Sequence, residues 1–348
     1  ICPMYIGEVA PSNPRGMLVS WNQFAIIFGR LLFYFVNLVI LGSHANPVYD
    51  AVGAIANMAD AQWTITTGWR YMFGSECVPA GLFTLLICFV PETPRYLVMI
   101  GQDEKALGIL SRINGSDKAR EILNDIKNTV TVKTEKVLSY GFMCIFVGIM
   151  LSVFQQAVGI NAVLYYAPRI FKDMGMDNEM AFTVVMGVIN ILFTLIAVFT
   201  VEKWGRKPLL IWGSIGMAIG AFGVALTFGR EGMAFITAAS IMVYSASFMF
   251  SWGPICWVLI AEIFPNTIRG KAVAIAVAFQ WIFNWIVSSS FVPMFNMHLT
   301  AGDNFGHWFT YGLYGLICVV AAIFVWRLVP ETKGKTLEDM SRLWRKDK

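Results

Sequence analysis

Amide side chains interrupt one of the most apolar stretches of this sequence. Gln155 and Gln156 are followed at short spacing by Asn161, Tyr165 and Tyr166, and most of their neighbours are apolar. A buried amide costs free energy unless it is hydrogen-bonded. Each amide offers a donor and an acceptor, which suits a ligand rich in hydroxyl groups. The alternative is that these amides only join neighbouring helices. Three amides and two tyrosines in one segment favour a binding site.

Two helix breaks are expected near such a site. Gly159 and Pro168 weaken the segment that carries the amides, as expected where a membrane span bends around a ligand. On a continuous helix Gln156 and Asn161 would lie about 140° apart, and both could border a cavity. Pro254 follows Gly253 in a second segment and removes a backbone hydrogen bond there.

Further polar and aromatic groups lie inside other apolar segments. These are Gln23, Asn190, Gln280, Trp281 and Asn284, together with Trp257 just after Pro254. The Trp257 ring could stack on the apolar face of a sugar, or it could simply pack among its neighbours. Amides and aromatic rings without charges indicate a neutral, hydroxylated solute.

Two polar phrases occur twice, in the same order. The pattern Glu-x-x-Pro-x-x-x-Arg-Gly spans residues 8–16 and again 262–270, and a phrase beginning Pro-Glu-Thr follows each copy, at 91–95 and 330–334. Polar phrases repeated around apolar segments are typical of a duplicated membrane bundle.

The charged residues of these phrases are expected at the cytoplasmic ends of membrane spans. We expect ion pairs between the two halves of the bundle when its cytoplasmic side is closed, and opening would break them. The alternative is that arginine and lysine only mark topology. Topology needs no acidic partners, so the repeated glutamates favour the gate. The residues of this gate are Glu8, Arg15, Glu92, Arg95, Glu202, Arg206, Glu262, Arg269 and Glu331.

Composition places the chain in a membrane. Of its 348 residues 57% are hydrophobic and only 14% are charged, whereas a soluble domain carries about 25% charged residues. The net charge of +4 is modest and fits basic cytoplasmic loops better than nucleic-acid binding. The six cysteines and three histidines show no ligand spacing, so we expect no metal, cofactor or disulfide framework. Because no catalytic motif is visible either, we expect no enzyme.

Eight segments have the length of about 20 apolar residues that a span needs. They are residues 17–41, 71–90, 138–166, 179–201, 208–228, 233–261, 271–295 and 308–328. The charged stretch 91–137 between the second and third is expected to form short amphipathic helices outside the membrane. Basic residues in alternate loops, such as Lys203 and Lys271, predict that this linker and both ends of the sequence are cytoplasmic.

Aligning the two copies predicts the domain organisation. Residues 138–330 hold a complete half of six spans, whereas residues 1–90 hold only two spans that follow the first Arg-Gly phrase. We therefore expect four more spans upstream in the natural protein, so that this sequence holds spans five to twelve. Residues 91–137 are the linker and residues 331–348 are a cytoplasmic tail.

Two charges lie deep inside the first two segments. Arg30 is about 20 Å and Glu76 about 21 Å from the cytoplasmic ends of their helices, at 1.5 Å per residue. At this shared depth we expect either an ion pair or a role of Glu76 in a proton relay.

These motifs together resemble the sugar porter family of the major facilitator superfamily. The similarity rests on the repeated phrases, on Gln155-Gln156-x-x-Gly159-x-Asn161, on Trp204-Gly205-Arg206-Lys207 and on Gly253-Pro254-x-x-Trp257. It implies an all-α integral membrane fold with two halves of six helices each, of which this chain is an eight-span fragment.

The resemblance also implies a function. It implies a monomer in the inner cell membrane that moves a monosaccharide, D-xylose foremost, together with protons through the lipid bilayer by alternating access. A passive hexose or pentose facilitator and a sugar sensor that does not transport remain the alternatives. Sugar hydroxyls would be held by Gln23, Gln155, Gln156, Asn161, Tyr165, Asn190, Trp257, Gln280 and Trp281.

Overall fold

The described part of the chain is built from helices. The computed structural model describes residues 5–6, 9–10, 15–42, 63–130, 137–173, 179–265, 267–298, 304–334 and 344. Their helices are α2 (Arg15–Gly42), η1 (Thr64–Gly68), α4 (Trp69–Ser75), α5 (Cys77–Ile87), α6 (Pro94–Met99), α7 (Asp103–Asn114), α8 (Ser116–Val130), η2 (Val137–Tyr140), α9 (Phe142–Ala157), α10 (Ile160–Tyr165), α11 (Ala167–Asp173), α12 (Glu179–Trp204), α13 (Arg206–Thr227), α14 (Ala234–Phe250), α15 (Trp252–Glu262), α16 (Arg269–Phe295) and α17 (Phe305–Leu328).

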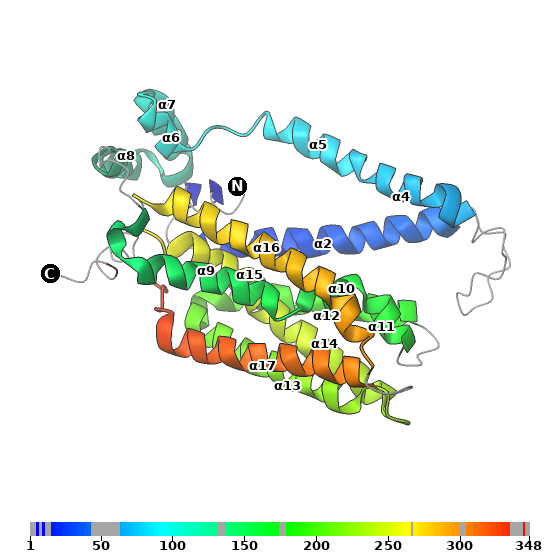
Figure 1. Cartoon of the computed structure of the whole chain (residues 1–348). Coiled ribbons are helices and arrows are strands. Elements are labelled where there is room, and N and C mark those ends of the chain that lie inside the picture. The colour runs from blue at the N-terminus through cyan, green and yellow to red at the C-terminus, as the bar shows by residue number, and fades with distance from the viewer. Residues whose placement is uncertain are drawn as a thin grey trace. The chain divides into compact units, whose positions relative to one another are not determined.

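Seven stretches of the described residues are long and apolar enough to cross a membrane. They are Met17–Asn37, Phe142–Tyr165, Val184–Trp204, Arg206–Thr227, Ala234–Glu262, Arg269–Phe295 and Phe305–Leu328. Each coincides with a segment expected from the sequence. The remaining expected segment, 71–90, forms two shorter helices, α4 and α5, which follow one another along nearly one line (Figure 1). Pro79 has no N–H to donate to Ser75, so the helix is interrupted beside Glu76.

Contacts divide the chain into two compact units. One unit comprises residues 25–92, and the other comprises residues 1–24 together with residues 93–348. The unit that includes residues 93–348 contains helices α9 to α17. There α13 packs on both α14 and α17, and α9 packs on α16.

Small residues let α13 approach α14 closely. Four glycines of α13 lie so near their neighbours that an added Cβ would meet Ser251, Ser247, Tyr244 and Ser240 in turn; they are Gly213, Gly216, Gly220 and Gly223. Because lipid tails are as apolar as leucine, helices in a membrane associate through such close packing rather than through the hydrophobic effect.

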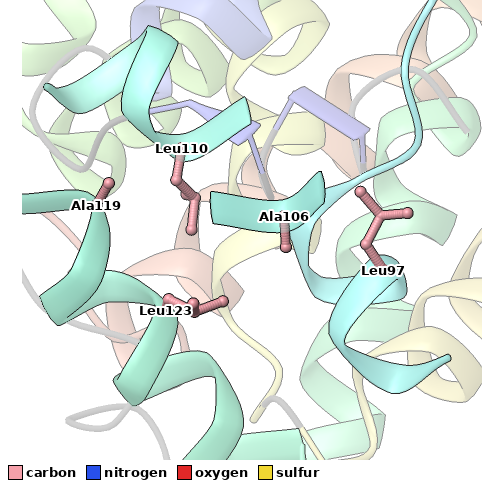
Figure 2. Close-up of a cluster of buried hydrophobic side chains, with 5 residues drawn as sticks. All are labelled: Leu97, Ala106, Leu110, Ala119 and Leu123. Atoms are coloured by element: carbon pink, nitrogen blue, oxygen red, sulfur yellow. The ribbon is translucent and has the colours of Figure 1, made fainter. Parts of the chain in front are cut away.

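The described helices between residues 93 and 130 share a small apolar core. Helices α6, α7 and α8 pack around buried apolar side chains that face one another (Figure 2), namely Leu97, Ala106, Leu110, Ala119 and Leu123. The Thr93 hydroxyl accepts a hydrogen bond of 3.2 Å from the Tyr96 N–H and caps α6. Lys127 pairs with Asp103 at 2.5 Å and joins α8 to α7. These are the short amphipathic helices expected between residues 91 and 137.

Both expected helix breaks are present. Helix α9 ends at Ala157 and α10 begins at Ile160, with Gly159 in the left-handed conformation at φ 84°. Helix α14 ends at Phe250 and α15 begins at Trp252. Pro254 lies in the first turn of α15, where its missing N–H leaves no intrahelical bond unmade. The break therefore falls just before the Gly-Pro pair.

Candidate functional site

Five amides from three helices form one hydrogen-bonded group, the amide cluster: Gln155, Gln156, Asn161, Gln280 and Asn284. The Gln156 Oε1 atom accepts from Asn161 Nδ2 at 2.7 Å and from Asn284 Nδ2 at 2.9 Å. Gln155 Oε1 accepts from Gln156 Nε2 at 3.1 Å and also from Gln280 Nε2. Helices α9, α10 and α16 thus contribute amides to a single network.

The break after α9 brings two of these amides together. On a continuous helix Gln156 and Asn161 would lie about 140° apart. With Gly159 between them in the left-handed conformation, the two side chains instead hydrogen-bond directly. The second break contributes as well, because Gln155 Nε2 donates to the carbonyl of Trp252 at 3.5 Å. The amide cluster therefore lies where two helices are interrupted.

One acceptor of the amide cluster is left over. Gln280 is 2% exposed, and its Oε1 atom is buried without a hydrogen-bond partner among the described residues. Buried polar atoms in folded proteins are almost always hydrogen-bonded. No charged side chain takes part in the hydrogen bonds found within the cluster among the described residues. A neutral donor, such as a ligand hydroxyl, would satisfy the Gln280 oxygen.

The other predicted sugar contacts come from helices α2, α10, α12, α15 and α16. Asn190 is buried on α12, and its Oδ1 accepts from Ser245 Oγ at 2.7 Å. Trp257 is half-buried on α15, whereas Tyr165 and Trp281 are 51% and 63% exposed. A Cβ on Gly253 would lie 3.5 Å from the Nε2 atom of Gln23, so Gln23 lies beside the second break. Both residues belong to the same compact unit.

The predicted gate residues include one buried arginine between two carboxylates. Arg206 is 3% exposed. Its guanidinium makes bonds of 2.9 and 3.1 Å to Glu202 and of 3.0 and 3.3 Å to Glu262. A guanidinium fork matches two carboxylates in this way because its donors are planar and fixed. Helices α12, α13 and α15 are therefore joined at one point.

Glu331 extends this charged group by capping a helix. Its carboxylate accepts from the backbone N–H of Arg206 at 3.0 Å and of Lys207 at 2.9 Å. These donors at the start of α13 have no intrahelical partner, and a negative charge is favourable there. The next residue, Thr332, donates to Glu262 Oε2 at 2.7 Å. Two residues of the second Pro-Glu-Thr phrase thus bind this charged group: Glu331 binds the backbone of Arg206, and Thr332 binds its partner Glu262.

The remaining charged predictions are only partly described. Arg269 is buried and donates to the Ala261 carbonyl at 2.8 and 2.5 Å. Glu8 and the Arg15 side chain lie outside the described residues. Of the other predicted gate residues, Glu92 is exposed and Arg95 is half-buried. The two residues predicted for proton coupling belong to the unit of residues 25–92, where Glu76 is exposed and Arg30 is half-buried.

Several residues in these two groups were missing from the predicted sites. Asn284 was named from the sequence among the polar groups inside apolar segments, but it was not counted as a sugar contact although it lies four residues after Gln280, one helical turn away. Trp252 takes part through its backbone carbonyl, which no residue type reveals. Thr332 is 3% exposed and bonds to Glu262 across 70 residues of sequence, so only the fold brings them together.

Comparison with known proteins places the chain among sugar transporters. The family described as "Sugar (and other) transporter" matches residues 1–344. The D-xylose-proton symporter of Escherichia coli K12 is 48% identical over 99% of this chain and 68% of its own length. The glucose facilitated diffusion protein of Zymomonas mobilis is 35% identical over 100% and 72%. A solved structure of a proton:xylose symporter bound to 6-bromo-6-deoxy-D-glucose superposes with a TM-score of 0.84, at 47% identity, over 98% of this chain and 70% of that one.

Proposed function

We propose that this chain, which belongs to the sugar transporter family of the major facilitator superfamily, moves D-xylose and a proton together across a membrane. The single observation that carries the proposal is the amide cluster with the unpaired Gln280 oxygen. It offers donors and acceptors without a charge, as a neutral polyol requires. The 48% identity to a D-xylose-proton symporter supports the choice of sugar and of the coupling ion.

In the proposed mechanism the amide cluster binds the sugar near the middle of the membrane. Sites at broken helices in the bilayer midplane are the rule in secondary transporters, which expose such a site to one side at a time. The half of the protein formed by residues 138–330 would rock against the half that includes residues 1–90, with residues 91–137 as the linker. We also propose that a single chain is the working unit, since the whole amide cluster belongs to one chain.

The charged group around Arg206 would act at the cytoplasmic side. Here Glu202, Glu262 and Glu331 keep neighbouring helix ends together. The proposed gate adds Glu8, Arg15, Glu92, Arg95 and Arg269, whose ion pairs would form when the cytoplasmic side closes. The linker and the tail from residue 331 onward would then also face the cytoplasm, as basic loops favour.

Proton coupling is the part of the proposal that Glu76 and Arg30 would serve. An ionisable side chain inside a span is expensive and is often retained for proton movement. In liposomes that hold the protein, Glu76→Gln should flatten the pH dependence of D-xylose uptake while sugar binding persists. Unchanged pH dependence would remove Glu76 from the coupling mechanism.

A passive sugar facilitator is the second candidate, because a glucose facilitated diffusion protein is also 35% identical. Uptake of D-xylose into liposomes separates the two functions. For a symporter, an inward proton gradient should drive accumulation above the external concentration, and sugar addition should make the outside medium more alkaline. Equilibration without alkalinisation would identify a facilitator. Failure to bind or move any monosaccharide would refute both.

A further inference from the structure

The break between α9 and α10 is enclosed by two tyrosines from other helices. Tyr244 of α14 is fully buried, and its hydroxyl donates to the carbonyl of Val158. The ring of Tyr314 from α17 fills the space where a Cβ on Gly159 would lie. Tyr244 therefore contacts Val158 and Tyr314 contacts Gly159, the two residues at which the helix is interrupted.

This break needs support from outside its own helices. The Val158 carbonyl belongs to the short connection between α9 and α10, and inside a membrane no bulk water is available to it. A buried carbonyl without a partner costs free energy comparable to a lost hydrogen bond. The Tyr244 hydroxyl supplies that partner. The Tyr314 ring limits how far Gly159 can move.

The position of the break fixes the geometry of the amide cluster. Gln156 comes three residues before Gly159, and Asn161 follows two residues after it. Their side chains meet at 2.7 Å, and Gln156 also binds Asn284. A shift of α10 relative to α9 would therefore move Asn161 away from the other amides.

We infer that Tyr244 and Tyr314 are positioning residues for sugar binding: they hold the α9–α10 break so that Gln156 and Asn161 face the sugar together. Neither side chain takes part in the amide cluster itself. The inference rests on the proposed sugar site and adds residues that act on it from outside.

The test measures the Kd of the purified protein for D-xylose by calorimetry. Tyr244→Phe removes only the hydroxyl, and Tyr314→Leu removes the ring beside Gly159. Each should weaken binding about three- to tenfold, as expected for the loss of one buried contact.

A matched control keeps the ring and removes a hydroxyl that the break does not use. The hydroxyl of Tyr311 is buried without a partner among the described residues. Tyr311→Phe should therefore leave the Kd unchanged.

A double-mutant cycle separates positioning from a general loss of stability. In an Asn161→Ala background, Tyr244→Phe should weaken binding no further, because its effect acts through Asn161. Equal weakening in both backgrounds, or unchanged affinity of both test variants, would overturn the inference. If Tyr244→Phe fails to fold, the contrast between Tyr314→Leu and Tyr311→Phe decides it alone. No sugar binding by the unchanged protein would refute the proposed function itself.

Discussion

At the scale of single residues, Gln280 shows how one amide can serve both structure and binding. Its N–H donates to Gln155, while its own oxygen is buried without a partner among the described residues. An unused buried acceptor costs about 1–3 kcal/mol. A ligand hydroxyl that binds there would recover part of that cost, which is a physical reason for the site to favour a hydroxylated solute.

Gln280→Met should weaken D-xylose binding about tenfold or more, because methionine has a similar volume but neither donor nor acceptor. Tryptophan fluorescence or calorimetry of the purified protein measures this. Ser152→Ala is the control, since the Ser152 hydroxyl is buried on the same helix as Gln155 and has no partner among the described residues. If both variants bind alike, the Gln280 amide is not a sugar contact.

At the scale of helices, interruptions and joints decide where the polar groups lie. The break at Gly159 turns two amides toward each other, and the break before Trp252 presents a carbonyl to Gln155. At helix ends, Arg206 joins α12, α13 and α15 through two carboxylates. The amide cluster depends on the breaks, whereas the packing of the helix ends depends on Arg206.

Gly159→Ala should lower the melting temperature strongly. Alanine disfavours φ 84°, and its Cβ would overlap the Tyr314 ring. Gly312→Ala on α17 is the matched control, because a Cβ there meets nothing within 4 Å; in a helix interior, alanine should be neutral or slightly stabilising. Thermal unfolding in detergent compares the two variants. A Gly159→Ala protein as stable as Gly312→Ala would contradict the described break.

Arg206→Lys should destabilise the protein although it keeps the charge. A lysine ammonium cannot bind Glu202 and Glu262 each with two bonds, so we expect a loss of about 1.5–3 kcal/mol. The exposed Arg230 provides the control Arg230→Lys, which should change little. Both are measured as shifts in melting temperature. An equal, small shift for the two variants would show that the buried joint contributes little.

At the scale of the whole molecule, the chain is a multi-pass membrane protein whose polar groups fall into two sets. The neutral amide cluster lies at interrupted spans, and the charged group lies at span ends. Buried neutral amides suit a sugar, and charges near a membrane surface are far less costly than charges inside it. This separation fits a binding site in the interior and a gate at one surface.

The orientation of the chain can be tested with introduced cysteines in a cysteine-free background. Lys203→Cys lies beside the basic turn between α12 and α13, and Arg230→Cys lies in the turn between α13 and α14. In intact cells a membrane-impermeant maleimide should label residue 230 only, because basic turns remain cytoplasmic. Residue 203 should become reactive after permeabilisation. The reverse pattern would invert the proposed topology.

Much of this protein could be predicted from local patterns. The apolar spans, the amphipathic linker and both helix breaks follow from hydropathy, charge and the Gly and Pro positions, which act over a few neighbouring residues. The segment 71–90 differs in its division into two helices beside Pro79. The ion pair of Glu202 with Arg206, four residues apart, is likewise a local feature.

By itself the sequence determined which residues could bind a sugar and which could form a gate, because residue type and spacing along a helix are local properties. Only the tertiary structure decided their partners. It joins Gln280 to Gln155 across 125 residues, Glu262 to Arg206 across 56 and Tyr244 to Val158 across 86. Such contacts arise from how helices pack, which depends on side chains far apart in the sequence.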